Sequence, residues 1–185
     1  MDLNQQLLNL AKERDFDFDA CTKLIKAGAV VNTQDDTGRT ALHYAVRSGN
    51  FELSKFLIKN GAQVDLKNKN GWTSLHCAAF YEHAELLKLI LAHTNEINAK
   101  DIEQKTPLIL ALEEGATQVC ISLLNSGADT SGAHVVLKSI VHTIRYPECN
   151  AAITAWLTAK VARDAVMEDI VSITPSSSIP KFNKS

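Results

Sequence analysis

The sequence predicts an all-α solenoid of stacked helix-turn-helix units, because two markers recur along it at one fixed distance. Thr40, Thr73 and Thr106 stand at the same place in three similar segments, each 33 residues after the one before. The second marker keeps the same period, at residues 28–29, 61–62, 94–95 and 127–128. Two independent markers with one period indicate a repeat protein, in which each helix pair is stabilised mainly by its neighbours.

The repeated segment resembles the ankyrin repeat family, whose unit of about 33 residues carries the pattern Thr-Pro-Leu-His-x-Ala. Here the pattern reads Thr-Ala-Leu-His-Tyr-Ala from Thr40, Thr-Ser-Leu-His-Cys-Ala from Thr73 and Thr-Pro-Leu-Ile-Leu-Ala from Thr106. The resemblance is strong over residues 32–130 and weaker outside them. It implies an ankyrin-repeat solenoid with short β-hairpin turns and one concave side.

Residues 1–31 are predicted to form an N-terminal capping repeat that lacks the first hairpin. Leu7, Leu8, Leu10 and Ala11 share one face of a first helix, and a second short helix ends at Gly28, which suits a left-handed turn. A stack requires such an atypical unit at its end.

Three full repeats are predicted over residues 32–130. Each begins with a tight turn and a threonine that caps the first helix, and Pro107 takes the first helical position of the third. The inward-facing residues of the first helices are Leu42, Ala45, Val46, Leu75, Ala78, Ala79, Leu108, Ala111 and Leu112. Glu82 and Thr94 stand where the pattern has glycine. Because a side chain is strained in the left-handed region, we expect altered turns at both.

The pattern is degenerate after residue 130. Residues 131–173 are predicted to form a C-terminal capping repeat with a long final helix, and residues 174–185 a flexible tail. We expect a monomer in which the final helix caps the stack. The alternative is that its overhang offers Met167, Ile170 and Val171 to another chain.

Composition and charge exclude several classes of partner. The chain has 185 residues, 45% of them apolar, and a formal net charge of −2. It is long enough for one sizeable core, and nucleic-acid binding would require a basic face. The start of the sequence lacks a secretory signal, and no apolar stretch approaches the roughly 18 residues of a membrane span. We expect a soluble, cytoplasmic protein without nucleic-acid or membrane contacts.

The four cysteines, at positions 21, 77, 120 and 149, are spaced neither as a disulfide framework nor as a Cys-x-x-Cys metal pair. We expect reduced thiols that fill space, and no metal or cofactor. A Cys149–His142 pair is the one nucleophilic arrangement that residue type allows, and nothing else in the sequence supports it. We therefore predict no enzymatic activity.

Polar residues within the repeats have structural explanations. His43 and His76 occupy the family's histidine position, where the resemblance implies a hydrogen-bonding ring that links adjacent turns. Asn32, Asp65 and Asn98 lie at the base of the turns, where their side chains can bond to nearby backbone.

Ankyrin proteins usually contact partners through the turn tips and the exposed side of the first helices. The candidate partner-binding residues are therefore Arg39, Arg47, Lys69, Asn70, Trp72, Phe80, Tyr81, Glu103, Lys105, Glu113 and Glu114. Trp72, Phe80 and Tyr81 meet in the central unit, with two arginines to one side and three glutamates to the other. Such a cluster is typical of an interface centre, with basic partner groups expected near the glutamates. Structural packing explains Trp72 or Phe80 equally well, and Tyr81 less well.

The predicted function is a non-catalytic adaptor or scaffold that binds a protein partner through the concave surface. The alternative is a stand-alone regulator or inhibitor that covers one partner's active surface. Small ankyrin proteins also resemble molecules that some intracellular bacteria and viruses deliver into host cells, and the sequence leaves this open.

Overall fold

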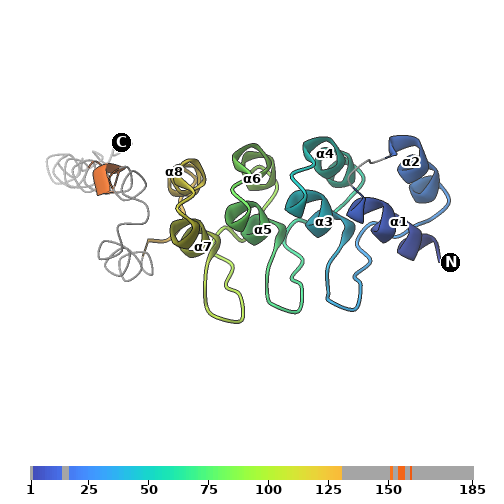
Figure 1. The fold of residues 1–185 in the computed structure, drawn as a ribbon, viewed down its shortest axis with the longest axis horizontal. Coiled ribbons are helices and arrows are strands. Elements are labelled where there is room, and N and C mark those ends of the chain that lie inside the picture. Colours follow the sequence, from blue (N-terminus) through green and yellow to red (C-terminus); the bar gives the residue numbers. More distant parts are fainter. Residues whose placement is uncertain (1, 14–16, 131–150, 152–153, 157–158, 160–185) are drawn as a thin grey trace, which may run out of the picture.

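The computed structural model describes residues 2–13, 17–130, 151, 154–156 and 159. Over the first two ranges the chain forms helix pairs stacked side by side in two layers (Figure 1). The first helices of the pairs form one layer: α1 (Leu3–Lys12), α3 (Ala41–Arg47), α5 (Ser74–Phe80) and α7 (Pro107–Glu114). The second helices form the other layer: α2 (Phe18–Lys26), α4 (Phe51–Lys59), α6 (Ala84–Leu91) and α8 (Thr117–Asn125). The predicted all-α solenoid is confirmed.

One apolar core runs along the stack between the two layers. Leu42, Leu75 and Leu108 occupy the same position in three successive first helices, and each is at most 1% exposed. Helix α5 packs against α3 on one side and α7 on the other, while α6 of its own pair covers it. Each unit therefore buries its apolar face against its neighbours, as a repeat architecture requires.

The first helices begin as the repeated threonines predict. The Thr40 hydroxyl accepts a hydrogen bond from the His43 N–H, and the Thr106 hydroxyl accepts one from the Ile109 N–H. These bonds satisfy N–H groups that have no partner within the helix. Pro107 opens α7, where its missing N–H costs nothing.

A turn precedes each of α3, α5 and α7 and projects from the first-helix layer (Figure 1). A backbone hydrogen bond closes each turn, and in the first it runs from the Asp35 N–H to the Arg39 carbonyl over 3.0 Å. The Asp35 carboxylate also accepts the N–H groups of Thr37 and Arg39. Successive turns are linked by isolated bonds such as that from the Lys69 N–H to the Thr37 carbonyl.

The turns are present where the β-hairpins were expected, but they contain no β-strand in the described residues, so this part of the expectation is wrong. The physical reason is that the side chain at the start of each turn takes N–H groups that a β-ladder would use. Asn68 and Asp101 repeat the arrangement seen at Asp35, each accepting two backbone N–H groups.

The expectation of an altered turn is also wrong at Glu82. This residue adopts the left-handed conformation with φ 59°, and the turn keeps its hydrogen bond from the His83 N–H to the Ala78 carbonyl. At Thr94 the backbone does change. Its N–H bonds to the Ile90 carbonyl, and the residue does not have the positive φ of its repeat equivalent Gly61.

Replacing Glu82 by glycine is expected to raise the free energy of unfolding. The left-handed conformation costs a residue with a Cβ about 1–2 kcal/mol, part of which the entropy of a glycine offsets, so a net gain of roughly 0.5–1 kcal/mol should remain. Urea unfolding followed by circular dichroism measures it. Gly49→Ala is the reverse control, because a Cβ on Gly49 (φ 74°) would lie 2.9 Å from the His83 ring. A lower midpoint for Glu82→Gly would contradict the strain argument.

Most of the predicted closing repeat, including most of its expected final helix, and all of the predicted tail lie outside the described residues. Trp156 is described, and its indole N–H donates to the Asn125 side-chain oxygen at the end of α8 over 2.9 Å. None of the helices in the described ranges is long and apolar enough to cross a membrane.

Candidate protein-binding surface

Two buried histidines fix the positions of the projecting turns. The Thr40 N–H donates to Nδ1 of His43 over 3.2 Å, so Nδ1 is unprotonated and Nε2 carries the proton. Nε2 then donates to the Trp72 carbonyl in the next unit over 3.0 Å. His76 repeats this arrangement with Thr73 and the Lys105 carbonyl. The predicted structural role of both rings is therefore confirmed.

Burial keeps both rings neutral. His43 and His76 are at most 1% exposed, and burial lowers the pKa of His43 and lowers that of His76 to about 4. Protonation of either ring at Nδ1 would also remove the acceptor that holds the threonine N–H. The rings thus tie each turn to the next unit and set the spacing of the side chains on the turns.

A second set of bonds joins neighbouring units at the base of the turns. The Asn32 side-chain NH₂ donates to the Gly61 carbonyl over 2.9 Å, and the Asn32 side-chain oxygen accepts the Gln63 N–H over 2.8 Å. Asp65 and Asn98 likewise accept backbone N–H groups from the following unit. The structural role predicted for these three residues is confirmed.

The concave surface is the face formed by the projecting turns and the exposed side of the first helices. In its central unit Trp72 lies 5.1 Å from Phe80, and Phe80 lies 5.1 Å from Tyr81, measured between ring centroids. The three rings form a continuous cluster, which we call the aromatic cluster. All three are half-buried, so each leaves part of its ring accessible to a partner.

The members of the aromatic cluster differ in what else they do. The Trp72 indole N–H donates to the Asp101 carboxylate in the next turn over 3.1 Å, and its carbonyl accepts the bond from His43. Trp72 therefore also links the units. Tyr81 stacks on His83 at 6.3 Å, and the Arg47 guanidinium lies 5.9 Å from its ring. These contacts of Tyr81 are surface contacts that involve no buried hydrogen bond.

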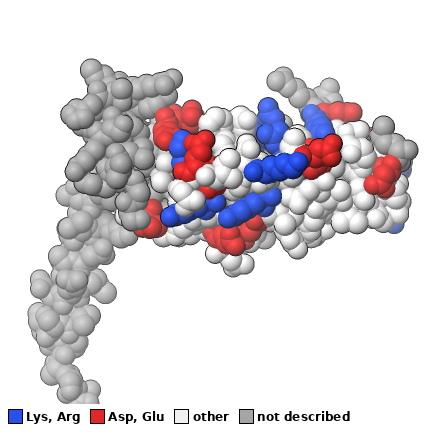
Figure 2. All heavy atoms as spheres, turned by 90° about the horizontal axis from the view of Figure 1, so that it is seen from below, with Lys and Arg blue, Asp and Glu red and all other residues white. Residues whose placement is uncertain are grey.

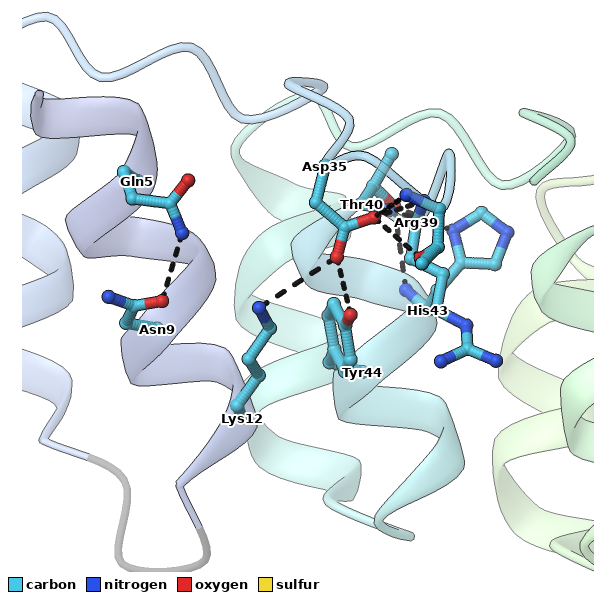
Figure 3. Close-up of polar contacts among 9 residues, drawn as sticks. Gln5, Asn9, Lys12, Asp35, Arg39, Thr40, His43 and Tyr44 are labelled. Carbon is cyan, nitrogen blue, oxygen red and sulfur yellow. Dashed lines mark hydrogen bonds and ion pairs between the residues drawn. The ribbon is translucent and has the colours of Figure 1, made fainter. Parts of the chain in front are cut away.

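On the N-terminal side of the aromatic cluster, basic side chains gather around Tyr44. The Lys12 ammonium lies 4.9 Å from the Tyr44 ring centroid, and the Arg39 guanidinium lies 5.9 Å from it. The Tyr44 hydroxyl donates to the Asp35 carboxylate, which fixes the ring (Figure 3). Burial alone would raise the pKa of Asp35, but hydrogen bonds from Thr37, Tyr44 and Arg39 lower it far below its ordinary value.

A hollow opens next to Tyr44. Its volume is about 790 Å³, and its lining residues are Lys12, Tyr44, Arg47, Ser48 and Asn50. Figure 2 shows the face from which the turns project, with Lys and Arg side chains across its middle and Asp and Glu side chains toward both ends. The N-terminal part of the concave surface therefore combines positive charge with room for a partner side chain.

On the C-terminal side, the acidic residues are partly neutralised within the chain. Lys105 lies 2.9 Å from Glu113 and 3.2 Å from Glu103, and hydrogen bonds to these two carboxylates raise its pKa. Glu114 is half-buried at the end of α7. The group carries one cation and three anions, so it remains negative overall.

The remaining predicted candidates, Lys69 and Asn70, are exposed at the tip of the second turn. Their backbone bonds join three successive turns, since the Lys69 N–H donates to Thr37 and the Asn70 carbonyl accepts from Ile102. Their side chains are thus available at the rim of the surface.

Sequence reasoning missed three residues at the N-terminal end of the concave surface, namely Lys12, Asp35 and Tyr44. Tyr44 has Cys77 and Leu110 as its repeat equivalents, and that departure from an apolar type was the signal available. Lys12 comes from the N-terminal unit, and only the stacking of α1 against α3 brings it to Tyr44.

The cysteines in the described ranges behave as buried thiols. Cys21, Cys77 and Cys120 are buried, and burial raises the pKa of Cys21 to about 11 and that of Cys77 to about 12. A protonated thiol is a poor nucleophile. The Cys149–His142 pair lies outside the described residues, and within them no three His, Cys, Asp or Glu side chains are grouped to hold a metal ion.

A family model described as ankyrin repeats (3 copies) matches the chain over residues 7–101 and 55–133. The two overlapping matches cover more than half of the sequence and include the second half of α1 and all of α2 to α8. No curated protein matches the chain significantly.

Proposed function

Because the chain belongs to the ankyrin repeat family, we propose that it is a non-catalytic adaptor or scaffold that binds a protein partner through its concave surface. Ankyrin repeats are generally protein–protein interaction modules. The concave surface is the candidate because its side chains are free of the core constraints that fix the opposite sides of the same helices.

The aromatic cluster is the observation that carries this proposal. Three half-buried rings lie in contact at the centre of the surface, with Arg47 over Tyr81 at its edge. Aromatic side chains bury a large area at a small entropic cost, and they are enriched in the energetically dominant centres of interfaces. The charged residues on either side would then form the rim and set the orientation of the partner.

The arrangement of charge supports one orientation. Glu103, Glu113 and Glu114 exceed the single cation Lys105 in number, so we propose that basic groups of the partner lie at this end. Arg39, Arg47, Lys69 and Asn70 would contact the partner at the other end and at the turn tips.

Replacing Tyr81 by alanine is expected to weaken partner binding on the order of 30-fold, equivalent to about 2 kcal/mol, with little change in stability. Tyr81 is the variant of choice because Trp72 also holds the Asp101 turn and its loss would disturb the fold. Affinity capture followed by calorimetric titration of the captured partner measures the effect. Phe18→Ala is a matched control, since Phe18 is 42% exposed in the other helix layer. Equal weakening by both variants would count against the concave surface.

The same purified pair separates an adaptor from the alternative, a regulator of one partner. A regulator changes the partner's activity in a two-component assay, whereas an adaptor needs a third component to have an effect. An effector delivered into a host cell would act as an adaptor or as a regulator, with a host protein as its partner. Both proposals include a cytoplasmic location.

A further inference from the structure

We propose that Lys12, Arg39 and Arg47, which we call the basic group, bind a carboxylate of the partner, so that the partner segment is acidic where it crosses α1 and α3. The inference deepens the proposed function, because it assigns a chemical class to the segment that the same concave surface binds. It rests on a comparison of equivalent positions in the three full units.

In two of the three full units, a residue on the turn contacts the residue eight positions later at the end of the first helix. In the second unit this pair is Trp72 and Phe80, in ring contact at 5.1 Å. In the third it is Lys105 and Glu113, an ion pair at 2.9 Å. In the first unit the same two positions hold Arg39 and Arg47. Two of the pairs are therefore complementary within the chain, while the equivalent positions of the first unit both carry a positive charge.

The two arginines have no anionic partner among the described residues. In the part of the chain that the structure describes, no carboxylate lies within ion-pair distance of either guanidinium. Each is instead positioned near a tyrosine ring, Arg39 near Tyr44 and Arg47 near Tyr81, both at 5.9 Å. Cation–π contacts hold a guanidinium in place without neutralising it, so both remain able to bind an anion.

Lys12 adds a third cation. Asp2 and Asp36 line a neighbouring hollow with Lys12 and Tyr44, and the acidic residue that pairs with Lys12, Asp35, is already occupied by hydrogen bonds. The Asp35 carboxylate accepts hydrogen bonds from Thr37, from the backbone N–H of Arg39 and from the Tyr44 hydroxyl, and its side chain is only 12% exposed. Lys12 lies 3.8 Å from it, beyond direct hydrogen-bond distance (Figure 3). The group of three cations and one anion is therefore positive overall.

The hollow provides the space for the bound group. Lys12 and Arg47 line it together with Tyr44, Ser48 and Asn50, and its volume of about 790 Å³ admits side chains of a partner segment. The Asn50 side-chain oxygen already caps α4 through the Leu53 N–H, which leaves its NH₂ group to donate. A carboxylate at this place would meet two cations and an amide donor.

A short acidic protein segment fits better than a long polyanion. The other end of the concave surface carries the excess negative charge of Glu103, Glu113 and Glu114. A nucleic acid lying along the surface would be repelled there, whereas a peptide can change charge along its length. The acidic part of the partner thus lies at α1 and α3.

The test uses the full chain and defined peptides. The probe is a nine-residue peptide with a central tyrosine flanked by glutamates, and its controls carry glutamine or lysine in place of every glutamate. Titration into the ¹⁵N-labelled protein, followed by two-dimensional NMR, should give saturable shifts at Tyr44, Arg47 and Ser48 for the acidic peptide. The glutamine and lysine peptides should bind at least about tenfold more weakly.

Arg47→Glu is the decisive variant, because it would place a carboxylate opposite Arg39 as Glu113 lies opposite Lys105. The variant should keep the fold and weaken binding of the acidic peptide at least about tenfold. Lys55→Glu is the matched control, since Lys55 is exposed on α4 in the other layer and the change in net charge is the same. This control should leave peptide binding unchanged.

Three results would overturn the inference: equal binding of the glutamine peptide, equal weakening by Lys55→Glu, or equally tight binding of an oligonucleotide of the same charge. A failure of this inference can be distinguished from a failure of the proposed function. If Tyr81→Ala weakens partner binding while Arg47→Glu weakens neither the partner nor the peptide, only the carboxylate inference fails. If neither variant weakens partner binding, the concave surface itself is the wrong site.

Discussion

Replacing Leu75 by alanine is expected to lower the free energy of unfolding by about 2–5 kcal/mol. Leu75 is fully buried in α5, and α5 packs against the first helices of both neighbouring units. The cavity left by the substitution would weaken two unit interfaces as well as the unit itself. Because small domains are stable by only about 5–15 kcal/mol, this single change would remove a large share of the total.

Chemical denaturation measures the effect directly. Leu91→Ala is a suitable control, since Leu91 lies at the end of α6 and is only partly buried, so its loss should be clearly smaller. Equal losses from the two variants would mean that stability does not come from the stacking of the first helices.

Lowering the pH from about 6.5 to about 4 is expected to destabilise the folded chain by roughly 3 kcal/mol through His76 alone, at 1.36 kcal/mol for each unit of pKa. In the unfolded chain His76 binds a proton below about 6.5, whereas in the folded chain burial lowers its pKa to about 4. Between these values the unfolded state binds more protons, so the stability is full at higher pH and is lost as the pH falls. Burial lowers the pKa of His43 as well, which adds an effect of the same sign.

Urea unfolding at several pH values between 7 and 4.5 gives the slope of stability against pH. His76→Gln should reduce this slope even if it lowers stability throughout, because the substituted residue does not titrate. A slope that survives His76→Gln intact would place the pH dependence elsewhere.

The fold could be predicted from the sequence because stacking imposes one period on the core. Leucines 33 residues apart can all be buried only if each unit presents the same face to the next, so the pattern specified the layers. The errors were local. At Glu82 the surrounding turn holds a left-handed backbone that the residue type disfavours, and the turn side chains at Asp35, Asn68 and Asp101 replace strand pairing.

The candidate site was less predictable, because its geometry depends on contacts between units. The repeat pattern put Trp72, Phe80 and Tyr81 in one unit, and they do form one cluster. The pattern did not indicate that Lys12 would contact Tyr44, or that Lys105 would form ion pairs with two of the three glutamates. These contacts join residues from different helices and turns, and the repeat period carries no information on side-chain conformation.

Site-specific photo-crosslinking tests the central claim most directly. A photoreactive phenylalanine analogue is placed at Tyr81 on the concave surface or, in a second variant, at Phe18 in the other helix layer, and each folded variant is irradiated with the partner. If the concave surface binds the partner, the variant with the probe at position 81 forms the covalent adduct and the variant with the probe at position 18 does not. An adduct from position 18 alone would contradict the account.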